Sequence, residues 1–126
     1  SKSIKGKVIE QLKTAGKVFN QDNKTFLKLG NENYEIMYYY LRNGKELSIN
    51  SPRIWEEKNH KSTIVNQSAI TKSNGLKIII VYPSTNKITR YINENEIEFV
   101  NNQLTYNFYI VTYNNLDSLI KKLKGD

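Results

Sequence analysis

Cysteine is absent from this sequence of 126 residues, and histidine occurs once, at position 60. Without cysteine the chain can form no disulfide bond, no thiolate nucleophile and no cysteine-ligated zinc site. Zinc prefers several nitrogen or sulfur ligands, which one histidine cannot provide. Any bound metal would therefore be held by oxygen atoms, which favours magnesium, manganese or calcium. The lack of cysteine also suits a reducing compartment, so we expect an intracellular (cytoplasmic) protein.

Long apolar stretches are missing as well. The apolar run at residues 78–82 is far shorter than the roughly 20 residues that a membrane-spanning helix needs. We therefore expect no membrane segment, and the sequence shows no signal-peptide pattern.

Composition and charge narrow the class of protein further. A hydrophobic share of 38% and a charged share of 25% are typical of a globular protein, and this length predicts a single domain, residues 1–126. The chain has 19 lysines and arginines but 12 aspartates and glutamates, a formal net charge of +7. This excess favours a polyanionic partner, with nucleic acid first and an acidic protein or anionic surface second. The alternative is a basic protein that binds nothing acidic.

The first half of the chain predicts one helix followed by strands. Ser3 is placed to cap a helix whose apolar residues recur at helical spacing up to a stop at Gly16. Asn43-Gly44 favours a type I′ turn, because both central residues of that turn need a positive φ. It predicts a hairpin that pairs Leu41 with Glu46. The strands expected in this half cover residues 25–29, 34–41, 45–50 and 53–58.

The second half predicts a mixture of both element types. Residues 62–73 are expected to form a helix closed by Asn74-Gly75, and the apolar residues 76–82 a central buried strand. Apolar positions at helical spacing predict a C-terminal helix over residues 116–123. Further strands are expected over residues 87–92, 96–100 and 104–113. The expected fold is α/β (or α+β): a mixed β-sheet flanked by helices, in the order helix, three or four strands, helix, several strands, helix.

Two carboxylates and a lysine form the main candidate site. Glu56 and Lys58 lie two residues apart on a predicted strand, so both side chains point to one face. If residues 50–52 form a three-residue connection, Glu46 lies opposite Glu56; a two-residue connection places it opposite Glu57 instead. Facing carboxylates destabilise a sheet unless a cation neutralises them. The first register therefore predicts a divalent-cation site.

The stretch 46–58, ELSINSPRIWEEK, resembles the PD-(D/E)xK nuclease superfamily, in which a carboxylate and a Glu-x-Lys motif lie on adjacent strands. Glu10, which follows Gly6 in the first predicted helix, matches a helical glutamate of that superfamily. The order of elements is most similar to phage junction resolvases and transposon end-cutting subunits. The resemblance implies a metal-dependent DNA endonuclease that uses magnesium or manganese. Glu46, Glu56 and Glu10 would bind the metal, and Lys58 would complete the catalytic set with Glu46 and Glu56.

The roles of the remaining residues follow from the same motif. Lys58 would orient the attacking water or stabilise the negative charge that develops on the phosphoryl oxygens. His60, Lys61 and Arg53 flank the motif and are the predicted contacts to nucleic acid, most simply DNA. A homodimer would suit the cutting of two strands.

Two interpretations from other functional classes stay open. A non-catalytic nucleic-acid-binding protein could use the same nuclease-like scaffold. A partner-targeting interaction or inhibitor protein could turn its basic surface toward an acidic protein. In both cases the glutamates and Lys58 would form a solvated strand whose ion pairs contribute little to stability.

Overall fold

The computed structural model describes residues 3–42, 45–83, 85 and 87–125. Its helices are α1 (Ile4–Lys13), α2 (Ser68–Thr71) and α3 (Leu116–Leu123), with a short 3-10 helix, η1 (Tyr113–Asn115), just before α3. One five-stranded sheet, sheet A, contains β1 (Lys17–Gln21), β2 (Lys24–Leu29), β3 (Glu32–Tyr40), β7 (Lys77–Tyr82) and β10 (Phe108–Thr112). Another, sheet B, contains β4 (Glu46–Ile49), β5 (Ile54–Lys58), β6 (Ser62–Asn66), β8 (Ile88–Asn93) and β9 (Glu96–Phe99).

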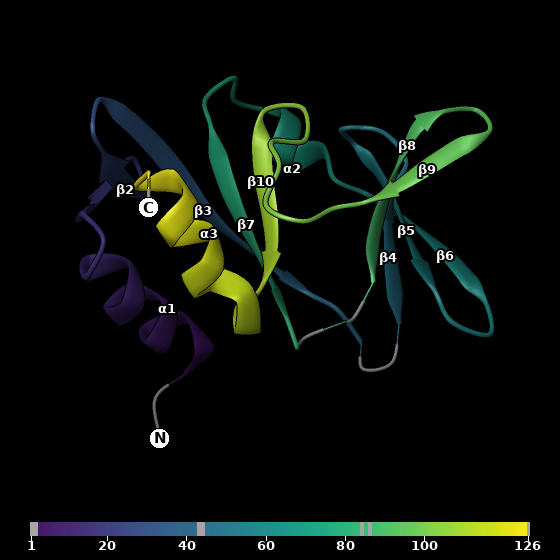
Figure 1. Cartoon of the computed structure of the whole chain (residues 1–126), viewed down its shortest axis with the longest axis horizontal. Coiled ribbons are helices and arrows are strands. Elements are labelled where there is room, and N and C mark those ends of the chain that lie inside the picture. The colour runs from purple at the N-terminus through teal and green to yellow at the C-terminus, as the bar shows by residue number, and fades with distance from the viewer. Residues whose placement is uncertain (1–2, 43–44, 84, 86, 126) are drawn as a thin grey trace.

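The strands form three layers with the helices. Sheet A has the order β1-β2-β3-β7-β10 and sheet B the order β6-β5-β4-β8-β9, and both mix parallel with antiparallel pairs. In Figure 1, α1 and α3 lie over one face of sheet A, and sheet B lies on the other side. The predicted mixed α/β class is confirmed, with the strands divided between two sheets.

Helix α1 begins where the sequence predicts. The Ser3 hydroxyl accepts a hydrogen bond from the Gly6 backbone N–H at 3.2 Å, which satisfies one of the free donors at a helix start. The helix ends at Lys13, before Gly16. Gly16 instead lies where the chain enters β1, and a Cβ there would be 2.3 Å from the backbone oxygen of Lys28. Only glycine fits that close approach.

The core has two parts, one on each face of sheet A. On the helix side, buried residues of α1 and α3, such as Val8 and Leu119, pack against Ile78 and Ile80. On the other side, Ile79 and Val81 pack against sheet B. Alternate residues of β7 therefore enter alternate cores, which explains its continuous apolar run and confirms the predicted buried strand. The sheet B residues in this second core are Leu47, Ile49, Trp55 and Ile88.

The chain passes from sheet A to sheet B twice, and the two passages run side by side. β3 pairs in parallel with β7 in sheet A, and their continuations β4 and β8 pair in parallel in sheet B. Hydrogen bonds join the passages between the sheets: the Leu41 N–H donates to the Tyr82 oxygen at 2.8 Å, and the Thr85 hydroxyl donates to the Lys45 oxygen at 2.7 Å. These two links from sheet A to sheet B are thus adjacent, and the chain returns to sheet A between β6 and β7 and between β9 and β10.

Residues 62–66 form a strand where the sequence predicted a helix. The helix expected over residues 62–73 is wrong, because Ser62–Asn66 pairs with β5 as strand β6 and only Ser68–Thr71 is helical. The β-branched residues at its start favour a strand. The turn predicted at Asn43-Gly44 lies outside the described residues, but β3 and β4 belong to different sheets and form no hairpin.

A hairpin that the sequence did not predict joins β1 and β2. Gln21 pairs with Lys24, and the two residues between them, Asp22 and Asn23, have φ values of 54° and 63°. Positive φ at both central positions is typical of a type I′ turn, and aspartate and asparagine tolerate it.

Within the described ranges, no helix has the length and apolar character that crossing a membrane requires.

Candidate functional site

The register of β4 and β5 differs from both predicted registers. Glu46 lies opposite Lys58, Ser48 opposite Glu56, and Leu47 opposite Glu57. The expected facing of Glu46 and Glu56 is therefore wrong by two residues. The cause is a longer connection, in which the backbone N–H groups of Asn50 and Ser51 both donate to the Ile54 oxygen.

A shift of two residues keeps every side chain on its expected face. Glu46, Glu56 and Lys58 therefore still share one face of sheet B, the face turned away from sheet A. We call it the outer face of sheet B. One row of side chains crosses all five strands of this face: Ile64, Glu56, Ser48, Thr89 and Phe99.

The glutamates of this face have separate partners. The Glu56 carboxylate accepts a hydrogen bond from the Asn50 amide at 3.2 Å. Hydrogen bonds from Ser62 and Asn50, with Lys58 nearby, hold the pKa of Glu56 below its usual value. Glu46 instead forms an ion pair with Lys87 at 3.5 Å, and both side chains are about half exposed. Each carboxylate is thus satisfied by the protein itself.

Lys58 is held near an aromatic ring. Its Nζ lies 6.0 Å from the centre of the Tyr91 ring, at the outer limit of a cation–π contact. Lys58 also sits across from Glu46 in the strand ladder, where opposite charges favour the pairing. These two contacts help to fix the position of Lys58 in the sheet.

The other predicted site residues are dispersed. Glu10 is on α1, which covers the helix side of sheet A, so sheet A lies between Glu10 and the outer face of sheet B. His60 and Lys61 are exposed in the turn that joins β5 to β6. Arg53 is exposed at the opposite end of β5. The structure brings Glu46, Glu56 and Lys58 onto one face but gathers none of the other predicted residues around them.

This arrangement does not fit the predicted divalent ion. Among the residues that the structure describes, no three aspartate, glutamate or histidine side chains lie close enough to hold a metal together. Magnesium bound by one or two carboxylates relies on substrate phosphates and waters for its other ligands. Here the carboxylates are engaged by Asn50 and Lys87 instead, so no metal-dependent step can be derived from these residues.

Glu57 has a more buried environment than the residues predicted to be catalytic. It points toward sheet A, where it accepts a hydrogen bond from the Tyr39 hydroxyl and lies 3.4 Å from the Lys45 ammonium. The Glu57 and Lys45 side chains are 12% and 14% exposed. Burial, followed by the hydrogen bond to Glu57, raises the pKa of Tyr39. Residue alternation indicated that Glu57 points away from Glu56, but nothing in the sequence identified Tyr39 or Lys45 as its partners.

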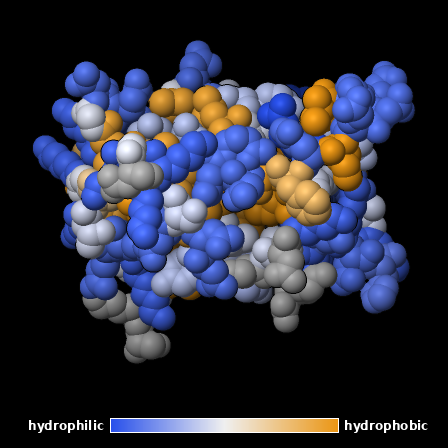
Figure 2. Space-filling model, in the orientation of Figure 1, coloured by the Kyte–Doolittle hydropathy of each residue, from blue (hydrophilic) through white to orange (hydrophobic). Residues whose placement is uncertain are grey.

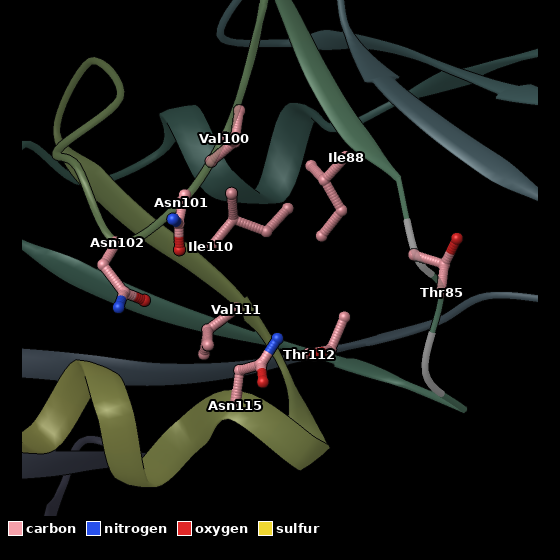
Figure 3. Close-up of a pocket in the computed structure, with 9 residues that line it drawn as sticks. All are labelled: Thr85, Ile88, Val100, Asn101, Asn102, Ile110, Val111, Thr112 and Asn115. Carbon is pink, nitrogen blue, oxygen red and sulfur yellow. The ribbon is translucent and has the colours of Figure 1, made fainter.

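A small, partly open cavity lies between β8 and β10. Figure 3 shows it lined by apolar side chains such as Ile88 and Ile110 and by the amides of Asn101, Asn102 and Asn115. Its volume is about 60 Å³. That is room for about two water molecules, and ligand pockets are several times larger. The cavity therefore provides no substrate site.

The positive charge of the molecule is concentrated around sheet A. Residues 3–42, 70–83 and 100–125, which form sheet A and the helices over it, contain 12 lysines and arginines and five aspartates and glutamates, a net of +7. Residues 45–69, 85 and 87–99, which form sheet B, contain six of each and are neutral. The excess that predicted a polyanionic partner thus lies entirely outside the half that carries the Glu-x-Lys motif.

Comparison with known proteins adds no further assignment. The chain has no significant match to a family model, to a curated protein or to a solved structure.

Proposed function

We propose that this protein binds nucleic acid without cleaving it. The observation that carries the proposal is the uneven charge: sheet A and its helices have a net of +7, whereas sheet B is neutral. A basic half next to a neutral half directs a polyanion to one side of the molecule, and lysines at that side would contact its phosphates.

The geometry of sheet B is why we favour binding over catalysis. Phosphodiester hydrolysis by metal ions needs carboxylates that converge on a shared ion. Glu46 and Glu56 are diagonal neighbours with different partners, and they lie in the neutral half. The metal-dependent endonuclease stays a prediction from the resemblance, and it is the alternative that an assay must address.

Salt dependence tests the binding proposal. Affinity for a labelled single strand and for a labelled duplex would be measured by fluorescence anisotropy at several salt concentrations, with EDTA present. If four phosphates are contacted, affinity should fall on the order of 100-fold between about 50 and 200 mM salt. The matched control is the double variant Arg53→Gln, Lys61→Gln in sheet B, which should bind like the wild type. No binding at low salt would reject the proposal.

Supercoiled plasmid separates the binder from the endonuclease. With magnesium or manganese present, we expect the wild type to leave the plasmid intact. Metal-dependent nicking that Glu56→Gln and Lys58→Ala abolish, but Asn59→Ala does not, would support the endonuclease and contradict our proposal.

A specific observation favours a second candidate function, self-association. On the outer face of sheet B, Ile64, Ile97 and Phe99 are 60%, 53% and 64% exposed. Figure 2 shows hydrophobic side chains at the surface around β8 and β9, at the right of the view. Large exposed apolar side chains on one neutral face are typical of protein interfaces. If this face forms a homodimer, sedimentation should show a dimer that Phe99→Asp dissociates and Tyr40→Asp, an exposed site in sheet A, does not.

A further inference from the structure

The β1–β2 hairpin presents two aromatic rings that belong to neither core. Val18 and Leu27 point to the helix side, so Phe19 and Phe26 point to the opposite side of sheet A. Their ring centroids are 5.4 Å apart and the rings are inclined by only 17°. Both side chains are partly exposed, and neither packs against the core residues between the sheets. They form a stacked pair at the edge of the molecule.

Lysines surround this aromatic pair on the same face. We define the hairpin face as the side chains that share this side of the two strands: Lys17, Phe19, Gln21, Lys24, Phe26 and Lys28. Lys17 lies directly opposite Lys28 in the ladder. Like charges in facing positions destabilise a strand pair unless an anion neutralises them.

Within the described part of the chain, no carboxylate supplies that anion to Lys17 or Lys28. Lys24 lies 3.9 Å from Glu35 on the neighbouring strand, but among the described residues neither Lys17 nor Lys28 has an ion-pair partner. Both side chains are exposed. The hairpin face therefore combines a partly exposed pair of stacked rings with two lysines that have no ion-pair partner among the described residues.

We propose that the hairpin face binds single-stranded nucleic acid, with bases stacked on Phe19 and Phe26 and phosphates contacted by Lys17 and Lys28. The proposal deepens the proposed function and rests on it. Aromatic rings beside lysines on a sheet surface are the recurrent means of holding unpaired bases. A duplex offers its phosphates but keeps its base faces stacked on one another, so it cannot use the rings.

A structural role for the pair is the competing explanation. A cross-strand aromatic pair stabilises a hairpin whether or not it binds a ligand. That role would account for the rings, but it leaves the facing lysines unexplained. The two explanations differ in what a change from phenylalanine to leucine or tyrosine does to binding.

The test compares variants by anisotropy with an oligothymidine strand and with a duplex of equal length, while circular dichroism checks folding. Phe19→Leu and Phe26→Leu should each weaken single-strand binding by roughly 5- to 150-fold, the range for one lost base stack, and change duplex binding little. Phe19→Tyr keeps a stacking ring and should bind like the wild type. Phe99→Leu, an exposed aromatic in sheet B, is the matched control. Lys17→Gln and Lys28→Gln should each reduce the salt slope of binding by about one phosphate contact.

The outcomes separate this inference from the proposed function. If binding is salt-dependent but folded Phe19→Leu and Phe26→Leu variants bind the single strand like the wild type, the hairpin face is not the site and the proposed function stands. The inference is likewise overturned, and the proposed function kept, if the duplex binds as tightly as the single strand. If the wild type binds neither at low salt, both proposals are rejected. If a leucine variant does not fold, the Phe19→Tyr variant and the lysine variants still test whether the hairpin face is the site. An unchanged salt slope in both Lys17→Gln and Lys28→Gln would overturn the inference.

Discussion

The Tyr39 hydroxyl of sheet A donates a hydrogen bond to the Glu57 carboxylate of sheet B, so this pair joins the two sheets. The Tyr39 ring also lies 5.2 Å from that of the buried Trp55, and Lys45 lies 3.4 Å from the other carboxylate oxygen. A charged group among such neighbours is stabilised only while its partners are present.

Glu57→Gln should therefore destabilise the fold. The change leaves the partly buried Lys45 without its carboxylate, and we expect a loss of about 1–3 kcal/mol in the free energy of unfolding. Urea denaturation followed by the fluorescence of Trp55 would measure it. Glu94→Gln, at an exposed position, is the control and should change stability little. An unchanged midpoint for Glu57→Gln would show that the contact contributes nothing.

Alkaline pH should weaken the fold through tyrosines. Burial raises the pKa values of Tyr34, Tyr38 and Tyr39 above the ordinary value of 10.0. Above pH 10.0 the unfolded chain loses these protons before the folded chain does, so stability is full below that pH and falls as pH rises further. The urea midpoint measured across this range should decline, and less steeply in Tyr39→Phe. Identical slopes for the variant and the wild type would exclude a contribution from Tyr39.

Asn50 should control the ionisation of Glu56. Hydrogen bonds from Ser62 and Asn50 lower the pKa of Glu56, so Asn50→Ala should raise it toward the ordinary value of 4.5. The associated stability is present above pH 4.5 and is lost as pH falls through the lower, folded pKa. Carboxyl-carbon NMR would follow the titration, with Asn59→Ala, in the exposed turn, as the comparison. The same Glu56 titration in both variants would argue against the contact.

The fully buried Lys77 should be needed for stability and not for binding. Its ammonium donates to the backbone oxygens of Ser73 and Gly75, each at 2.8 Å, and burial lowers its pKa. Lys77→Met would leave both oxygens without this donor, and we expect a loss of about 1–3 kcal/mol by thermal or urea unfolding. Lys72→Met, which removes an exposed lysine nearby, should cost little. Equal stability of the two variants would contradict this role.

Sequence patterns correctly predicted a strand that is buried on both faces and a helix that begins at a capping serine. The apolar run of β7 and the Ser3 cap of α1 are both found in the structure. Alternation along β5 correctly placed Glu56 and Lys58 on one face and Glu57 on the other. These features depend on residues close together in sequence, which is why local patterns suffice for them.

Features that depend on distant pairing could not be predicted in the same way. The register of β4 and β5 depends on how residues 50–53 turn, and β4 also pairs with β8 from far along the chain. The Asn43-Gly44 pair predicted a hairpin between β3 and β4. In the structure, β3 instead pairs with β7 in sheet A, and β4 pairs with β8 in sheet B. The weaker Asp22-Asn23 pair is the one that forms a hairpin turn. Residue type alone could not tell which of these turn signals would be used.

The side-by-side passages between the sheets also bear on how the chain folds. The residues that pair between β3 and β7, and between β4 and β8, are about forty positions apart in the sequence. Pairing at such separation makes the search for the native topology slow, on a scale of milliseconds to seconds. Each sheet combines strands from before and after α2. Neither sheet can therefore assemble fully from one continuous stretch of chain. We therefore expect both sheets to form and melt together, in a single kinetic phase seen alike by Trp55 fluorescence and by circular dichroism.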